Sequence, residues 1–125
     1  MNKRFARFFT LSLVVMLATG CATASLTQTA TPAQSAAIAL LEQGKPREAA
    51  QQLEAQAATA SGAQRSRLLA DAAFAWNEAG DAARARSLLA QVTPRQLAGD
   101  ERGRYQLLSA EFALADKQPA QALQL

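Results

Sequence analysis

One turn signal recurs along this chain at a fixed interval. Gly44, Gly80 and Asp116 follow one another at intervals of 36 residues, between stretches rich in alanine, leucine, glutamine, glutamate and arginine. These residue types favour helices, and strand-forming runs of valine, isoleucine and threonine are missing from residues 33–125. A period of this length is typical of stacked helical hairpins. The repeat therefore predicts an all-α fold, an α-solenoid of stacked helical hairpins, over residues 33–125.

The copies of the repeat share the same physical parts. A glycine at the turn can close one helix in the left-handed conformation, so that the next helix starts at once. Five residues later a small side chain, Ala49 or Ala85, lets the two helices approach, whereas the third copy has Gln121 there. Nine residues after the turn a leucine fills the gap between the helices, as at Leu53, Leu89 and Leu125.

These signals predict six helices. We expect them over residues 33–43, 46–60, 64–79, 82–91, 100–115 and 119 onward. Pro46 and Pro119 suit a first helical turn, and Asp81 and Asp100 suit the cap of the fourth and the fifth helix. Residues 93–97 form a short linker with a single turn. Because the sixth helix stops without a polar closing element, which solenoids need, we expect the domain to be truncated at its C-terminus.

Two predicted helices have an apolar face at helical spacing. The third has Leu69, Ala72, Ala73 and Trp76, and the fifth has Tyr105, Leu108 and Phe112. Trp76 with Phe74 can be interpreted as a platform for a ligand or as part of the core. The helical setting favours the core.

The first 20 residues do not belong to this pattern. Lys3, Arg4 and Arg7 form a basic head, and residues 8–18 are an apolar run broken only by a threonine and a serine. The run is too short to span a bilayer and ends in small residues, as secretory signals do. We predict a cleaved signal peptide over residues 1–20; the alternative is an N-terminal membrane helix.

Small residues at positions 18–20 lead directly into Cys21, the only cysteine of the chain. The segment Ala18-Thr19-Gly20-Cys21 resembles the bacterial lipobox, with alanine at a position where leucine is usual. The resemblance implies cleavage before Cys21 and lipidation of this residue with acyl chains such as palmitate. Ala22, where aspartate often marks inner-membrane retention, implies anchoring in the inner leaflet of the outer membrane, facing the periplasm. Residues 21–32 would then be a lipidated, flexible tether.

The charge of the whole chain overstates its basicity. There are 13 basic and 10 acidic residues, a net charge of +3. Three basic residues leave with the signal peptide, so the mature chain has 13 − 3 = 10 basic against 10 acidic side chains. This balance gives no support for binding nucleic acid.

Few residues could carry catalysis. The chain has no histidine, which excludes Ser-His and Cys-His nucleophile pairs and histidine metal sites. Carboxylates occur in two pairs, Asp100 with Glu101 and Glu111 with Asp116, and a glycosidase would use two. We interpret them as solvated side chains, because charged residues are mostly exposed. We therefore expect no enzyme activity, no catalytic residues, no metal and no cofactor.

Four arginines could form a basic patch for an acidic partner or glycan: Arg65, Arg67, Arg84 and Arg86. The alternative is ordinary surface charge, with Glu78 and Asp81 nearby to balance it. We favour ordinary surface charge on grounds of exposure.

Residues 33–125 resemble tetratricopeptide repeats, whose second helix has alanine and a large residue at these offsets. Residues 88–97, followed by Arg104 and Tyr105 at the start of a helix, resemble the N-terminal domain of the LpoA family. Members of this family are outer-membrane lipoproteins that activate a bifunctional penicillin-binding protein. The resemblance implies a regulator of peptidoglycan synthesis with that synthase as partner, peptidoglycan as a further contact, and a C-terminal domain of periplasmic-binding-protein type.

Two other functions stay open. One is a lipidated tetratricopeptide adaptor for outer-membrane protein assembly or pilus assembly. The other is an enzyme such as a murein hydrolase, which needs a catalytic acid that these residues do not supply convincingly.

Overall fold

The computed structural model describes residues 30–118, 120 and 123. Its helices are α1 (Pro32–Glu42), α2 (Pro46–Thr59), α3 (Gly62–Glu78), α4 (Ala82–Leu89), the 3-10 turn η1 (Pro94–Gln96) and α5 (Gly99–Ala115). These residues contain no strand, and none of their helices is long and apolar enough to cross a membrane. The all-α class is confirmed. The predicted signal peptide, Cys21 and most of the tether lie outside the described residues, as do most residues of the predicted sixth helix.

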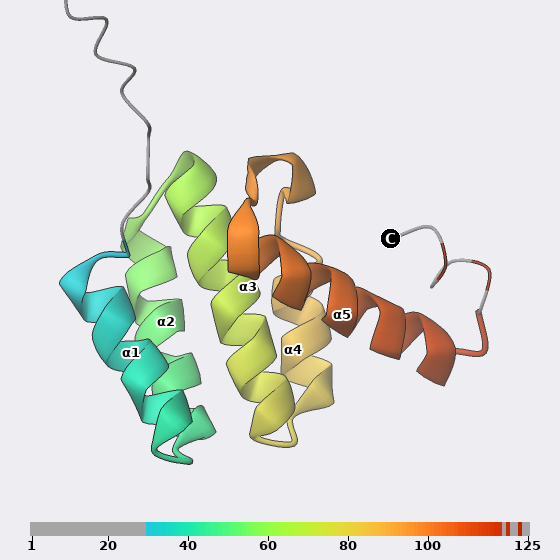
Figure 1. The fold of residues 1–125 in the computed structure, drawn as a ribbon, viewed down its shortest axis with the longest axis horizontal. Coiled ribbons are helices and arrows are strands. Elements are labelled where there is room, and N and C mark those ends of the chain that lie inside the picture. Colours follow the sequence, from blue (N-terminus) through green and yellow to red (C-terminus); the bar gives the residue numbers. More distant parts are fainter. Residues whose placement is uncertain (1–29, 119, 121–122, 124–125) are drawn as a thin grey trace, which may run out of the picture.

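The five predicted helices within this range are present, and each end lies within two residues of the predicted one. Figure 1 shows α1 to α4 side by side, whereas α5 runs obliquely to them. Helix α5 packs mainly on α3 and makes only a narrow contact with α4. The first four helices therefore form two regular hairpins, and α5 departs from their direction.

The two hairpin turns have the same hydrogen bonding. Gly44 has φ +73° and Gly80 has φ +82°, so both are left-handed. The amide of the residue after each glycine donates to a carbonyl of the preceding helix, at 2.9 Å from Lys45 to Leu40 and 2.9 Å from Asp81 to Trp76. These bonds satisfy carbonyl groups that a helix end leaves free. The predicted role of both glycines is confirmed.

The third turn differs from the prediction. Asp116, the expected counterpart of Gly44 and Gly80, caps α5 with an ordinary φ of −83°. Lys117 is the left-handed residue, with φ +59°, and the next amide donates to Ala113 O at 2.8 Å. The assignment of Asp116 was wrong by one residue, because α5 continues through Ala115 before the chain turns.

The helix starts follow the sequence signals with one exception. The carboxylate of Asp81 accepts a hydrogen bond of 3.0 Å from the Arg84 amide, which confirms it as the cap of α4. Pro46 lies in the first turn of α2, also as predicted. Asp100 does not cap α5, because Ala98 is the last extended residue and Asp100 already lies inside the helix. Its negative charge still complements the positive end of the helix dipole.

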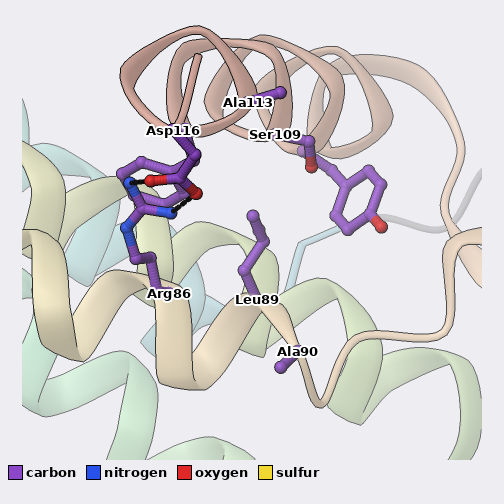
Figure 2. A pocket seen from close by; sticks show the side chains of 8 residues that line it. Arg86, Leu89, Ala90, Ser109, Ala113 and Asp116 are labelled. Carbon is purple, nitrogen blue, oxygen red and sulfur yellow. Dashed lines mark hydrogen bonds and ion pairs between the residues drawn. The ribbon is translucent and has the colours of Figure 1, made fainter. Parts of the chain in front are cut away.

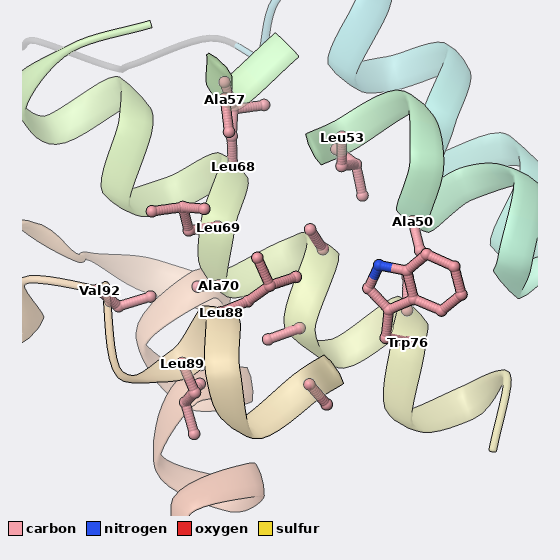
Figure 3. Close-up of a cluster of buried hydrophobic side chains, with 14 of the residues drawn as sticks. Ala50, Leu53, Ala57, Leu68, Leu69, Ala70, Trp76, Leu88, Leu89 and Val92 are labelled. Carbon is pink, nitrogen blue, oxygen red and sulfur yellow. The ribbon is translucent and has the colours of Figure 1, made fainter. Parts of the chain in front are cut away.

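The core lies between α2, α3 and α4 (Figure 3). Ala49, Ala85 and Leu53 are fully buried and Leu89 is buried, as the repeat predicts. The small alanine side chains bring the helix axes close, and the leucines fill the remaining space. The predicted inner face of α3 is buried throughout: Leu69, Ala72, Ala73 and Trp76. On α5, Leu108 is buried, and Tyr105 and Phe112 pack partly buried against the core.

Candidate binding surface

One side of the molecule is formed by the first helix of each hairpin together with α5. We call it the α1–α3–α5 face and define it by Leu41, Phe74, Glu78, Leu107, Glu111 and Leu114. Contacts between the helices make it continuous. Leu41, Phe74 and Glu78 line one hollow, Asn77 Nδ2 donates to Glu111 Oε2 at 3.4 Å, and the Arg104 guanidinium lies 5.8 Å from the Phe74 ring.

A buried carboxylate lies beneath this face. Asp71, in the middle of α3, is only 1% exposed. Gln34 Nε2 of α1 donates to Asp71 Oδ2 at 3.0 Å, and Arg104 Nη1 of α5 donates to Asp71 Oδ1 at 2.6 Å. One side chain thus connects all three helices of the face.

Burial raises the pKa of Asp71 above its ordinary value of 3.8. The positive charge of Arg104 and the hydrogen bonds from Gln34 and Arg104 act in the opposite direction without cancelling the effect. A carboxylate in such a place is destabilising unless its partners stay in position. The stability of the fold therefore depends on α1 and α5 keeping Gln34 and Arg104 next to Asp71.

The surface above this cluster is apolar and open. Leu107 is 54% exposed and Leu114 is 59% exposed, two turns apart on α5. On α1 and α3, half-buried Leu41 and Phe74 line a hollow of about 300 Å³, together with Glu78 and the residues of the first turn. Large apolar side chains gathered on one exposed face are typical of a protein interaction site.

A second hollow lies between α4 and α5 and has a volume of about 270 Å³ (Figure 2). Arg86 and Asp116 form an ion pair at one side of it, with nitrogen to oxygen distances of 2.8 and 3.2 Å. The Arg86 guanidinium also lies 4.1 Å from the centre of the Phe112 ring. Because the two charges neutralise each other, this cleft offers a ligand no free charge.

The four arginines do not act as one patch. Arg84 forms an ion pair of 2.8 Å with Glu54 and lies 4.5 Å over the Trp76 ring, while Arg86 pairs with Asp116. Arg65 Nη1 donates to the Ala57 carbonyl at 2.9 Å. Arg67 is half-buried, and its Nη1 has no partner among the described residues.

The interpretation as ordinary surface charge fits the exposed Arg84 and Arg86, and the charge of Asp81 acts on Arg84 as expected. Glu54 and Asp116 pair with Arg84 and Arg86, whereas Glu78 pairs with neither. These partners come from other helices, which the spacing within one helix does not reveal.

The two aromatic candidates have different surroundings. Trp76 is 2% exposed, with its ring against α2 and Ala50 nearby (Figure 3), so its predicted place in the core is confirmed. Phe74 points to the α1–α3–α5 face instead. The indole Nε1 of Trp76 is buried without a hydrogen-bond partner among the described residues.

The candidate carboxylates are dispersed along α5. Asp100 and Glu101 lie in its first turn, Glu111 accepts a hydrogen bond from Asn77, and Asp116 pairs with Arg86. Within residues 30–118, no three acidic, histidine or cysteine side chains come together in a group that could hold a metal ion. Cys21, the predicted lipidation site, lies outside the described residues.

Residues 88–97, on which the expected resemblance to the LpoA family rests, join α4 to η1 and pack on the rest of the fold. The large aliphatic residues of this segment are buried: Leu88, Leu89, Val92 and Leu97. Gln96 Oε1 accepts a hydrogen bond of 2.8 Å from the Ser66 hydroxyl of α3. Comparisons of the chain with protein families, with characterised proteins and with solved structures find no match.

Sequence reasoning missed the Asp71 cluster, although one signal was present. Asp71 interrupts a run of alanine, leucine and phenylalanine over residues 68–75 that otherwise suits a buried helix. An acidic residue in such a run needs a partner. Its partners, Gln34 and Arg104, are 37 and 33 residues away, and no local pattern identifies them.

Proposed function

We propose that this chain is a lipid-anchored interaction domain of the outer membrane that helps to activate a bifunctional penicillin-binding protein. In this role it regulates peptidoglycan synthesis as a scaffold and catalyses no reaction itself. The observation that carries the proposal is the α1–α3–α5 face, where Leu107 and Leu114 are more than half exposed and Phe74 is half-buried. Such a face is suited to holding a protein partner.

A tetratricopeptide-like arrangement is part of this proposal. Two hairpins have the same left-handed turn, and a buried alanine and a buried leucine follow each turn at equal distances. The oblique direction of α5 and the shift of the third turn to Lys117 are departures from strict repetition. We propose that these departures open the face where α5 leaves the stack.

The lipid anchor rests on the residues that precede the fold. A basic head, an apolar run and the lipobox-like segment ending in Cys21 support export and acylation. Residues 22–31 consist mainly of alanine, threonine, serine and glutamine, which suits a tether. The tether would let the face reach a synthase and the peptidoglycan beneath the outer membrane.

The choice of synthase rests on the resemblance of residues 88–97 and of Arg104 with Tyr105 to the LpoA family. These residues join α4 to α5 and hold α5 on α3 through Asp71. They therefore support a fold similar to that of the LpoA family in this segment. Their support for the same partner protein is less direct.

Reconstitution tests the proposal. A purified bifunctional penicillin-binding protein is assayed for glycan polymerisation and cross-linking, with and without the lipidated mature chain. We expect stimulation by the wild type and its loss in a Leu107→Ser, Leu114→Ser double variant. Gln52→Ser, on the exposed side of α2, is the matched control and should stimulate normally. Equal stimulation by the wild type and by both variants would contradict the proposed role of the face. The absence of stimulation by the wild type would contradict the proposed function of the protein.

The exposed apolar face also suits an adaptor for outer-membrane protein or pilus assembly. A photo-reactive amino acid in place of Leu107 separates the two functions in cells. Cross-links to a penicillin-binding protein would support synthase activation. Cross-links to a component of an outer-membrane assembly machine would favour the adaptor.

A further inference from the structure

Glu78 of the α1–α3–α5 face and Glu42 at the end of α1 occupy unfavourable positions for the fold. Glu42 is the last residue of α1 and Glu78 is the last residue of α3. The last turns of the described helices α1, α3 and α5 contain no basic residue. A negative charge at the C-terminal end of a helix opposes the helix dipole and is destabilising. The positions of Glu42 and Glu78 therefore do not serve helix stability.

These carboxylates are also unpaired. Neither Glu42, Glu78 nor Glu111 forms an ion pair with another residue of the described part. Lys45 and Arg47 line a neighbouring hollow together with Glu78, but neither forms an ion pair with it: Lys45 lies 4.0 Å from Glu48, and the Arg47 guanidinium lies 5.8 Å from the centre of the Trp76 ring. Figure 1 shows that α1 and α3 end on the same side of the bundle. The Glu78 carboxylate at this end of the face therefore has no ion-pair partner among the described residues.

Apolar surface and negative charge meet in one hollow. Leu41, Pro46 and Phe74 form apolar walls, and Glu78 lies beside them in a space of about 300 Å³. The side chain of lysine or arginine has an apolar stem and a charged head, so it can lie along such walls and bring its head to a carboxylate. The hollow has the chemistry for a basic side chain.

The rest of the face suits apolar side chains. Leu107 and Leu114 are seven residues apart on α5, a separation of about 10 Å along the helix axis. Both lie on the same side of α5 as Glu111, which Asn77 holds against α3. A bound segment could therefore place apolar groups on α5 while its basic group enters the hollow between α1 and α3.

We propose that the α1–α3–α5 face selects a segment of a partner protein that combines apolar and basic side chains. The basic group binds beside Glu78, and the apolar groups cover Leu107 and Leu114. This inference rests on the proposed function, since it specifies the partner segment that the interaction domain recognises.

A pair of synthetic peptides tests this selectivity. One fluorescent peptide contains leucine and lysine, and the second has glutamate at each lysine position. Binding to the mature chain is measured by fluorescence anisotropy at low and at high salt. We expect the lysine peptide to bind, its affinity to fall with salt, and the glutamate peptide to bind much more weakly.

Three variants locate the site. Glu78→Gln should lower the affinity for the lysine peptide about fivefold, which is the effect of one solvent-exposed charge pair at contact distance. Phe74→Ala should lower the affinity for the lysine peptide about tenfold, because the ring takes part in both the charged and the apolar contacts. Asp100→Asn, at the opposite end of α5, removes a matched exposed carboxylate and should leave the affinity unchanged. Thermal unfolding of each variant verifies that the fold is retained.

The inference is overturned if the two peptides bind equally, if neither binds, or if Glu78→Gln and Asp100→Asn behave alike. Synthase activation is a separate readout. If the chain activates the synthase but does not prefer the lysine peptide, the inference fails and the proposed function stands. If the lysine peptide binds at Glu78 and no synthase responds, the proposed function fails and the selectivity stands.

Discussion

Arg104 in α5 lies 2.6 Å from the carboxylate of Asp71, which is buried in the middle of α3. Gln34 of α1 donates to the other oxygen of the same carboxylate. A satisfied buried network of this kind favours one arrangement of the helices, because any other leaves a charge without its partners. The direction of α5, and with it the position of Leu107 and Leu114, depends on this pair.

Replacing Arg104 by alanine should therefore destabilise the protein strongly. The variant leaves the Asp71 carboxylate buried with Gln34 as its remaining partner, and we expect a loss of about 3 kcal/mol at neutral pH. Urea unfolding measures the loss. Arg95→Ala, an exposed arginine in η1 without an ion pair in the described part, is the control and should change the unfolding free energy by less than about 0.5 kcal/mol. Equal losses in the two variants would show that the Asp71 contact is unimportant.

The loss in Arg104→Ala should also depend on pH. The pKa of Asp71 is raised in the folded protein, so its contribution is most favourable at low pH and is lost as the pH rises through the folded pKa. Without the arginine the folded pKa rises further, because a cause that lowers it is removed. The difference between wild type and variant should shrink as the pH falls from neutral toward this range. A difference that stays constant would contradict the burial of Asp71.

Local signals predicted the hairpins well, whereas contacts between distant residues could not be predicted. Gly44 and Gly80 mark their turns because glycine adopts the left-handed conformation at little cost. Lys117 adopts the same conformation without such a mark, which is why the third turn was assigned to Asp116. The oblique direction of α5 depends on Asp71 and Arg104, which pair across 33 residues, so no periodicity contains it.

The left-handed glycines give a second test. An alanine at Gly80 meets no atom within 4 Å, so its cost comes from the backbone conformation alone, with φ +82°. We expect Gly80→Ala to destabilise the protein by about 1–2 kcal/mol. Gly103→Ala is the matched control, because this glycine lies within helix α5 and also has open space around it. It should stabilise the protein by about 0.5–1 kcal/mol. Changes of the same sign in thermal or urea unfolding would contradict the assigned turn.

Trp76 should be essential for stability. Its ring fills the space between α2 and α3 and lies under Arg84, so Trp76→Ala should cost about 3–5 kcal/mol. Leu114→Ala removes an apolar side chain that is 59% exposed, and it should change the unfolding free energy by less than about 0.5 kcal/mol. The two variants are compared by urea unfolding. A small effect of Trp76→Ala would mean that the ring does not pack in the core.

The predicted lipid anchor has a direct test in Cys21→Ser. The variant lacks the thiol that accepts the lipid, and with it the acyl chains, each methylene of which contributes roughly 0.8 kcal/mol to membrane binding. We expect the wild type to incorporate labelled palmitate and to fractionate with the outer membrane, and the variant to do neither. Ala22→Ser, next to the cysteine, is the matched control and should behave as the wild type. Continued outer-membrane residence of Cys21→Ser would contradict the lipoprotein interpretation.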